Sequence, residues 1–158
     1  MPEPIEFRIV QNLQAALQAI ALGAGYHYDV HAVAVKLDPN SAVEALTAPG
    51  GPRPLLLIEV KPGPWQYSPA SQVKRVLPMT VHWVSESTPT DDVSRMQTFF
   101  RGCADVEQAI TVDLSRGGLA ADTRIIRQNF DTAVDGSQVW GQNEIEVHLH
   151  RTFGQPNG

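Results

Sequence analysis

The sequence predicts an α+β domain: a mostly antiparallel sheet of about five strands, with two amphipathic helices packed on one face. Two long segments place apolar residues three or four positions apart, as helices with one buried side do. Several shorter segments are continuously apolar or alternate apolar and polar residues, as strands do. The 158 residues contain no repeat or long linker, so we expect a single domain over residues 1–158.

The first half of the chain predicts two helices and two strands. The spacing of Ile9, Leu13 and Leu17 indicates a helix that Gly23 ends, and Asn40 or Ser41 is expected to cap a second helix. In chain order we expect a helix from 5 to about 22, a strand at 26–36, a short helix at 42–46 and a central strand at 55–60.

An irregular loop is expected at about 61–72, because this segment holds three prolines. The loop also carries Trp65 and Tyr67. These are residue types that often anchor protein interfaces, although Trp65 folding back onto the sheet edge is an equal alternative. The next segment, 73–85, reads as a strand in which Pro78 requires a bulge or an edge position.

A second long helix is expected to begin at Asp91-Asp92, where carboxylates offset the helix dipole, and to end before Arg116. The last third predicts a C-terminal hairpin at about 121–153, with a turn at Asp135-Gly136. The apolar stripe of the long helix consists of Val93, Met96, Phe99, Phe100, Cys103, Val106, Ala109 and Ile110.

Composition excludes several classes of protein. The net charge is −5 with no basic cluster, which argues against a role in gripping nucleic acid. Cys103 is the single cysteine, so a disulfide scaffold is excluded. We find neither a signal-peptide pattern nor an apolar run of membrane length, and therefore expect a soluble, cytoplasmic protein without membrane contact. Only 18% of residues are charged, against about a quarter in typical domains, which is consistent with a surface partly covered by partners.

The segment EIEVHLHR of the last strand places two carboxylates and two imidazoles on one face. His148 and His150 with Glu146 are candidate ligands for one metal ion, since zinc takes three or four such groups. A strand face that meets solvent or another subunit is the interpretation we prefer, so we expect no metal. The expected interface residues are Trp65, Tyr67, Glu144, Glu146, His148, His150 and Arg151.

Other candidates for chemistry have simpler structural explanations. Cys103 lies on the apolar stripe of a helix, so we expect core packing rather than a nucleophile. The segment Ser115-Arg-Gly-Gly118 resembles an anion-binding turn, but a helix end explains it better. We find no nucleotide-binding or hydrolase motif, and expect no catalytic residue, no enzyme activity and no cofactor.

The order of these features resembles that of the tail terminator and tail-completion proteins of long-tailed bacteriophages, over nearly the whole chain. In that family a helix and a glycine-containing turn precede a hairpin, whose last strand runs into Gly-x-Pro. The matching pieces here are Asp105-Val106, Ala109-Ile110, Asp113, Leu114, Gly117-Gly118, Ala120 and Arg151-Thr-Phe-Gly-Gln-Pro156.

This resemblance implies a virion structural protein, assembled in the host cytoplasm and located at the head-proximal end of the tail. It implies a hexameric ring that caps the tail tube, stops its polymerisation and docks to the head–tail connector protein. DNA would pass through the lumen without specific binding. A head–tail connector or head-completion protein of the same virion is the alternative. A small metal-dependent enzyme or binding domain using His148 and His150 is the alternative from another class.

Overall fold

The computed structural model describes residues 3–48, 50, 53–67, 72–86, 91–132 and 137–152. Six strands form one sheet, in the order β1-β2-β4-β6-β5, and the short β3 pairs with β4 off this path. β1 and β2 are parallel, whereas the other strand pairs are antiparallel, which confirms the predicted sheet. The strands are β1 (Ala32–Lys36), β2 (Leu55–Val60), β3 (Trp65–Tyr67), β4 (Gln72–Glu86), β5 (Asp122–Thr132) and β6 (Gln138–Thr152).

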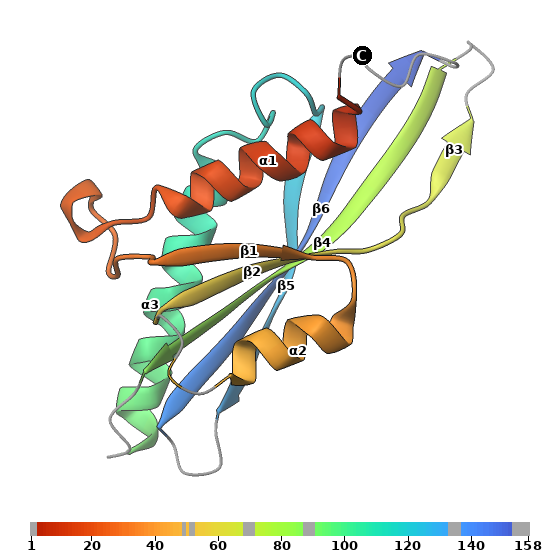
Figure 1. Cartoon of the computed structure of the whole chain (residues 1–158). Helices are drawn as coiled ribbons and strands as arrows, with labels where there is room; N and C mark the ends of the chain where they lie inside the picture. The colour runs from red at the N-terminus through yellow and green to blue at the C-terminus, as the bar shows by residue number, and fades with distance from the viewer. Residues whose placement is uncertain are drawn as a thin grey trace.

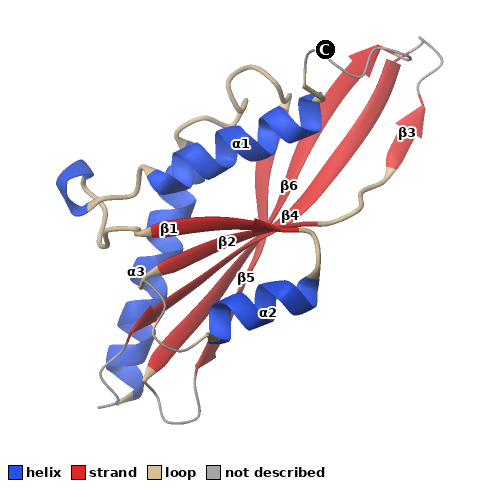
Figure 2. Cartoon of the chain, in the orientation of Figure 1, coloured by secondary structure: helices blue, strands red, loops and turns tan. Residues whose placement is uncertain are grey.

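The helices lie on both sides of this sheet (Figures 1 and 2). The two long helices, α1 (Ile5–Gln18) and α3 (Asp92–Thr111), share one face, as predicted. The short helix α2 (Pro39–Thr47) lies on the opposite face and contacts β1 and β2. A 3₁₀ turn (Leu22–Ala24) follows α1. Within the described residues, no helix is long and apolar enough to cross a membrane.

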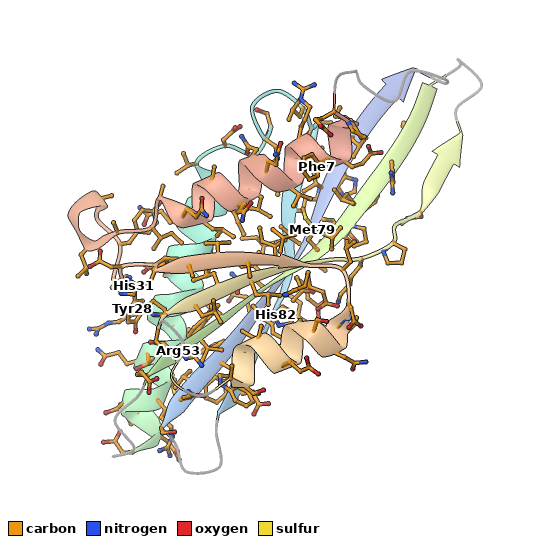
Figure 3. The ribbon with its side chains drawn as sticks, in the orientation of Figure 1. Phe7, Tyr28, His31, Arg53, Met79 and His82 are labelled. Carbon is orange, nitrogen blue, oxygen red and sulfur yellow. The ribbon has the colours of Figure 1, made fainter. Side chains whose placement is uncertain are left out.

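Alternation along the central strands builds the core between the sheet and the two long helices. In β4, Met79 points toward α1 and is 1% exposed, whereas His82 points toward α2 (Figure 3). In β6, Ile145, Val147 and Leu149 are buried on the side of the long helices. The two faces of the sheet therefore carry different chemistry, which follows from the period of two along a strand.

The first helix and the first strand are shorter in the structure than the sequence pattern predicts. α1 ends at Gln18, and β1 begins only at Ala32. The reason lies in α3, where the buried carboxylate of Asp105 accepts hydrogen bonds from the backbone N–H groups of His27 (2.9 Å) and Tyr28 (3.0 Å). This backbone is thus held by a side chain of the helix layer and is not part of the sheet.

The cap of α2 also differs from the prediction. Neither Asn40 nor Ser41 is the N-cap; instead the carboxylate of Asp38 accepts hydrogen bonds from both of their backbone N–H groups. Pro39 occupies the first helical position, where a missing N–H costs nothing. The helix therefore starts three residues earlier than the pattern indicates.

The predicted loop at 61–72 contains the short edge strand β3, so this prediction was wrong in part. Pro78 was expected at a bulge or an edge, yet it lies inside β4, and the pairing with β6 is continuous across it. Its carbonyl accepts from Lys61 N–H at 3.0 Å, just beyond the end of β2. Proline fits there because its nitrogen, which carries no hydrogen, points toward the gap between β2 and β3. No hydrogen bond to β6 is therefore lost.

The stripe of the long helix is only partly buried. Phe99, Cys103, Val106 and Ile110 belong to the core, as predicted. The other members near the start of α3 are exposed, at 73% for Val93, 51% for Met96 and 58% for Phe100. We call these three residues the α3 patch.

Candidate functional site

The sheet face opposite α1 and α3 carries the polar residues of the hairpin, and we call it the open face. The pairing of β5 with β6 brings oppositely charged and amide side chains next to one another there. Its hairpin residues are Asp122, Arg124, Arg127, Asn129, Asp131, Trp140, Gln142, Glu144, Glu146, His148 and His150.

Glu144 is held by partners on the neighbouring strand. Its carboxylate accepts from Arg127 Nη2 at 2.9 Å and from Asn129 Nδ2 at 3.0 Å. These bonds, that of Arg127 first, hold the pKa of Glu144 below its ordinary value. Glu144 thus joins the two strands of the hairpin within one chain.

The candidate metal ligands lie on the same face, as the alternation predicts. His148 Nε2 is 3.2 Å from Glu146 Oε2, and His150 is exposed at the end of the strand. Among the residues that the structure describes, no three His, Cys, Asp or Glu side chains come together as a metal site would need. The side chains of Trp65, Tyr67 and Arg151 lie outside the described part of the chain, as does the turn at Asp135-Gly136.

A hollow on the open face was not predicted from the sequence. It has a volume of about 500 Å³ and lies between α2 and the strands β5 and β6. Glu59 and His82 line it from β2 and β4, and Asn129, Asp131, Trp140 and Gln142 line it from the hairpin. The hollow exists because the nine residues of α2 cover β1 and β2 but leave the rest of this face open.

The most distinctive group in this hollow is a buried pair of a carboxyl group and an imidazole. Glu59 and His82 are 6% and 9% exposed, and His82 Nε2 lies 2.7 Å from Glu59 Oε2. Each is the single ionisable residue of an apolar strand segment, LLLIEV and MTVHWV. A lone ionisable residue in such a segment needs a partner, so the signal was present, but only the pairing of β2 with β4 identifies the partner.

The backbone N–H groups of the glycine-rich turn after α3 already bind a carboxylate of the same turn, that of Asp113. The carboxylate of Asp113 accepts from the hydroxyl of Ser115 (2.6 Å) and from the backbone N–H groups of Gly117 (2.5 Å) and Ser115 (3.0 Å), and these bonds, that of the hydroxyl first, lower its pKa. Arg116 is fully buried, and its guanidinium donates to the carbonyl oxygens of Ile110 and Asp113. α3 ends earlier than predicted, at Thr111 with Val112 as its C-cap, so the interpretation of this segment as a helix end was wrong in part: it is a connecting turn beyond the helix.

Two further expectations about α3 are confirmed. Cys103 is buried, and this burial raises the pKa of its thiol to about 11, so it is a core residue. Asp91 caps the helix, since its carboxylate accepts from Ser94 N–H at 2.6 Å, which lowers its pKa. Neither residue contributes to a reactive site.

Comparison with known proteins adds little to this picture. No family model matches the chain, and no curated protein sequence matches it. Among solved structures, the chain is similar to one of a particle titled "Virion of native gene transfer agent (GTA) particle". The identity is 11% and the TM-score 0.42, over 90% of this chain and 92% of that chain. A similarity this distant assigns no role and no partner to the chain.

Proposed function

We propose that this chain is a structural protein of a long-tailed phage-like virion and acts as its tail terminator. Six copies form a ring that caps the tail tube, stops its polymerisation and docks to the head–tail connector. The proposal places the chain at the head-proximal end of the tail. It rests first on the order of sequence features, whose matching residues include Asp105, Asp113 and Gly117.

Those matching residues hold the fold together, as is expected for an assembly protein. Asp105 fixes the segment before β1, and Asp113 closes the turn after α3. We assign no catalytic residue and no cofactor to the chain. The net charge of −5 also suits a lumen through which DNA slides, because phosphates are repelled rather than held.

The observation that carries the ring is the presence of two unlike surfaces on opposite sides of the sheet. The α3 patch is apolar and exposed, whereas the open face is polar and carries the hollow. A ring repeats one heterologous contact, which joins two different surfaces of adjacent copies. We propose that the α3 patch of one copy meets the open face of the next.

A head–tail connector or head-completion protein remains the alternative within the same virion. Both roles need a ring, and they differ only in the protein that the ring contacts. Mixing purified protein with isolated tail tubes and imaging by electron microscopy separates them, because a terminator decorates tube ends.

The experiment that tests the ring is light scattering at two concentrations, with metal content measured on the same peak. We expect a metal-free species of six times 17.3 kDa. Phe100→Glu should shift the mass toward the monomer, whereas Leu37→Glu, at an 80% exposed apolar residue far from α3 in the sequence, should not. A monomer or dimer with one tightly held zinc per chain would support the metal-dependent alternative and make His148 and His150 the first residues to replace.

A further inference from the structure

We infer that the outer edge of β5 takes up an extended segment of a partner protein as an additional antiparallel strand. β5 is the last strand on its side of the sheet, since it pairs with β6 and with no other strand that the structure describes. About half of the backbone N–H and C=O groups of such a strand point away from its neighbour and are available for further hydrogen bonds. The inference does not depend on the proposed ring.

The second half of β5 is the part suited to strand addition. A bulge between Ile125 and Arg127 interrupts the strand before it, and such bulges commonly protect sheet edges from pairing. From Arg127 to Thr132 the pairing with β6 is regular, and this stretch contains neither a bulge nor a proline. Its length of roughly six residues is typical of one strand. We call the residues from Arg127 to Thr132 the β5 edge segment.

Most side chains of the β5 edge segment are left uncovered by the rest of the described chain. Arg127, Gln128, Phe130 and Asp131 are all exposed. The ring of Phe130 packs against that of Phe99 on the side of α3, with 4.9 Å between the centroids, and yet 49% of the residue is exposed. This exposed ring beside a free edge offers an apolar cross-strand contact to an added strand.

The other free edges of the described sheet are less suited to pairing. At the opposite end of the sheet lies β1, where the carbonyl oxygen of Val33 already accepts from Gln14 Nε2 of α1 at 3.0 Å. β3 has only three residues. A second copy would therefore pair mainly through its own β5 edge segment, in which Phe130 is the single apolar residue. A strand of another protein fits better, because it brings apolar β-branched side chains opposite Phe130.

The alternation along β5 defines which side chains an added strand should carry. Gln128 and Phe130 lie on the side of the long helices, whereas Arg127 and Asp131 lie on the open face. An antiparallel strand fits with apolar residues opposite Phe130 and Gln128, a basic residue opposite Asp131 and an acidic one opposite Arg127. Both charged residues already interact within the chain, so these charges select the orientation and add little affinity.

Titration with the peptide acetyl-Lys-Val-Thr-Val-Glu-amide tests the site, because it places these residue types in antiparallel order. The readout is the backbone N–H resonances of the β5 edge segment and their rates of hydrogen exchange. We expect saturable shifts, with slower exchange of the N–H groups that point away from β6. No saturable shift up to the solubility limit of the peptide would overturn the inference. Protection of the same groups that rises with protein concentration, without peptide, would also overturn it, since a second copy would then occupy the edge.

Two N-methylated peptides with the same side chains are the matched controls. One carries N-methyl groups on both valines, and the other carries them on the threonine and the glutamate. Since successive N–H groups of a strand point in opposite directions, only one of these sets faces β5. One control should therefore bind at least roughly tenfold more weakly than the parent peptide, while the other binds about as tightly. Equal binding of the two controls would contradict strand addition.

Two variants of the protein locate the contact on β5. Phe130→Ala removes the exposed ring and should weaken binding of the parent peptide by roughly two- to fivefold. Ile126→Ala is the matched control, because Ile126 is 54% exposed on the same strand but lies at the bulge, outside the β5 edge segment, and should leave binding unchanged. An equal loss in both variants would contradict the assignment. The comparison of the methylated peptides on the unaltered protein holds even if Phe130→Ala fails to fold.

Discussion

At the scale of single residues, the side chain of Trp83 requires glycine at two positions. Its fully buried indole lies against α3 and β6, with the ring centroid 6.0 Å from that of Phe99. A Cβ added at Gly102 would be 2.6 Å from this ring, and one at Gly141 would be 2.2 Å from it. These two glycines are thus required by close approach, because the interior is packed too tightly for a methyl group to enter.

Replacement of Gly141 by alanine tests this requirement. We expect Gly141→Ala to lower the free energy of unfolding by about 1–3 kcal/mol, as overpacking a core does. Gly23→Ala is the matched control, since no atom lies within 4 Å of the added Cβ. Urea denaturation followed by circular dichroism measures both. A Gly141→Ala variant as stable as the control would contradict the position of Trp83.

The single cysteine offers a second test at this scale. Cys103 is 2% exposed, and burial raises the pKa of its thiol to about 11. Since the thiolate is the reactive form, the native protein should resist iodoacetamide at pH 8, while the protein unfolded in urea should be fully alkylated. Mass spectrometry over time gives both rates. Rapid alkylation of native protein would show that the thiol is accessible and not a core group.

At the scale of elements, periodicity correctly predicted features that depend on one segment, such as which face of a strand is buried. It missed features that depend on contacts between two segments, such as where a strand begins. The alternation of Ile145, Val147 and Leu149 was enough to place the polar face of β6 correctly. The late start of β1 could not be predicted, because Asp105, far along the sequence, takes the N–H groups of His27 and Tyr28. Side chains of neighbouring elements override local pattern in this way.

The features of the candidate site also differ in whether one segment or several determine them. The shared face of Glu146 and His148 follows from spacing alone, whereas the hollow depends on where α2 lies on the sheet. The exposure of the α3 patch has the same origin. Its residues continue the apolar stripe in the sequence, but among the described residues the core ends near Phe99.

The bond between Arg127 and Glu144 gives a pH-dependent prediction for the hairpin. The pKa of Glu144 is lower in the folded protein than its ordinary value of 4.5. Its ionised form therefore stabilises the fold above pH 4.5, and this contribution is lost as pH falls through the lowered pKa. At pH 7, Glu144→Gln should be less stable by roughly 0.2–1 kcal/mol, a small effect because Arg127 is 65% exposed and screened by water.

Unfolding in urea at pH 7 and at steps below 4.5 measures this difference. The gap between the unaltered protein and Glu144→Gln should close on acidification, while Glu44→Gln, at an exposed position of α2, should be as stable as the unaltered protein at pH 7. A gap that widens toward low pH would mean that the sign of the pKa shift is wrong.

At the scale of the whole molecule, the two sides of the sheet have different roles. The side with α1 and α3 contains the core and ends in the α3 patch, while the open face carries paired charges and the hollow. The long strands β4 and β6, with β3 beside them, extend past the helices at the upper right of Figure 1. Most of the core thus lies on one face. On the other face only the apolar residues Leu55, Leu57 and Val84, on the side of α2, are comparably buried among the apolar strand residues that the structure describes, and the hairpin strands beyond α2 are available for contacts with partners.

Replacement of both histidines of β6 tests this separation. His148 and His150 lie on the open face, outside the core, with His148 beside Glu146 at 3.2 Å. His148→Ala/His150→Ala should therefore keep the fold and its thermal midpoint, and at most weaken ring assembly. The matched control is Leu149→Ala between them, where loss of a fully buried side chain should cost about 2–5 kcal/mol.

Thermal unfolding and light scattering on the same samples give the two readouts. A folded double variant with a lighter assembly would mean that the open face of β6 takes part in the contact between copies. A folded variant with unchanged assembly would place that contact elsewhere on the open face and leave the separation of roles intact. Loss of the fold would mean that these histidines stabilise the structure. One zinc per chain that the unaltered protein binds and the double variant lacks would mean that they hold a metal ion. Neither result is expected of a surface that is used only for contacts with partners.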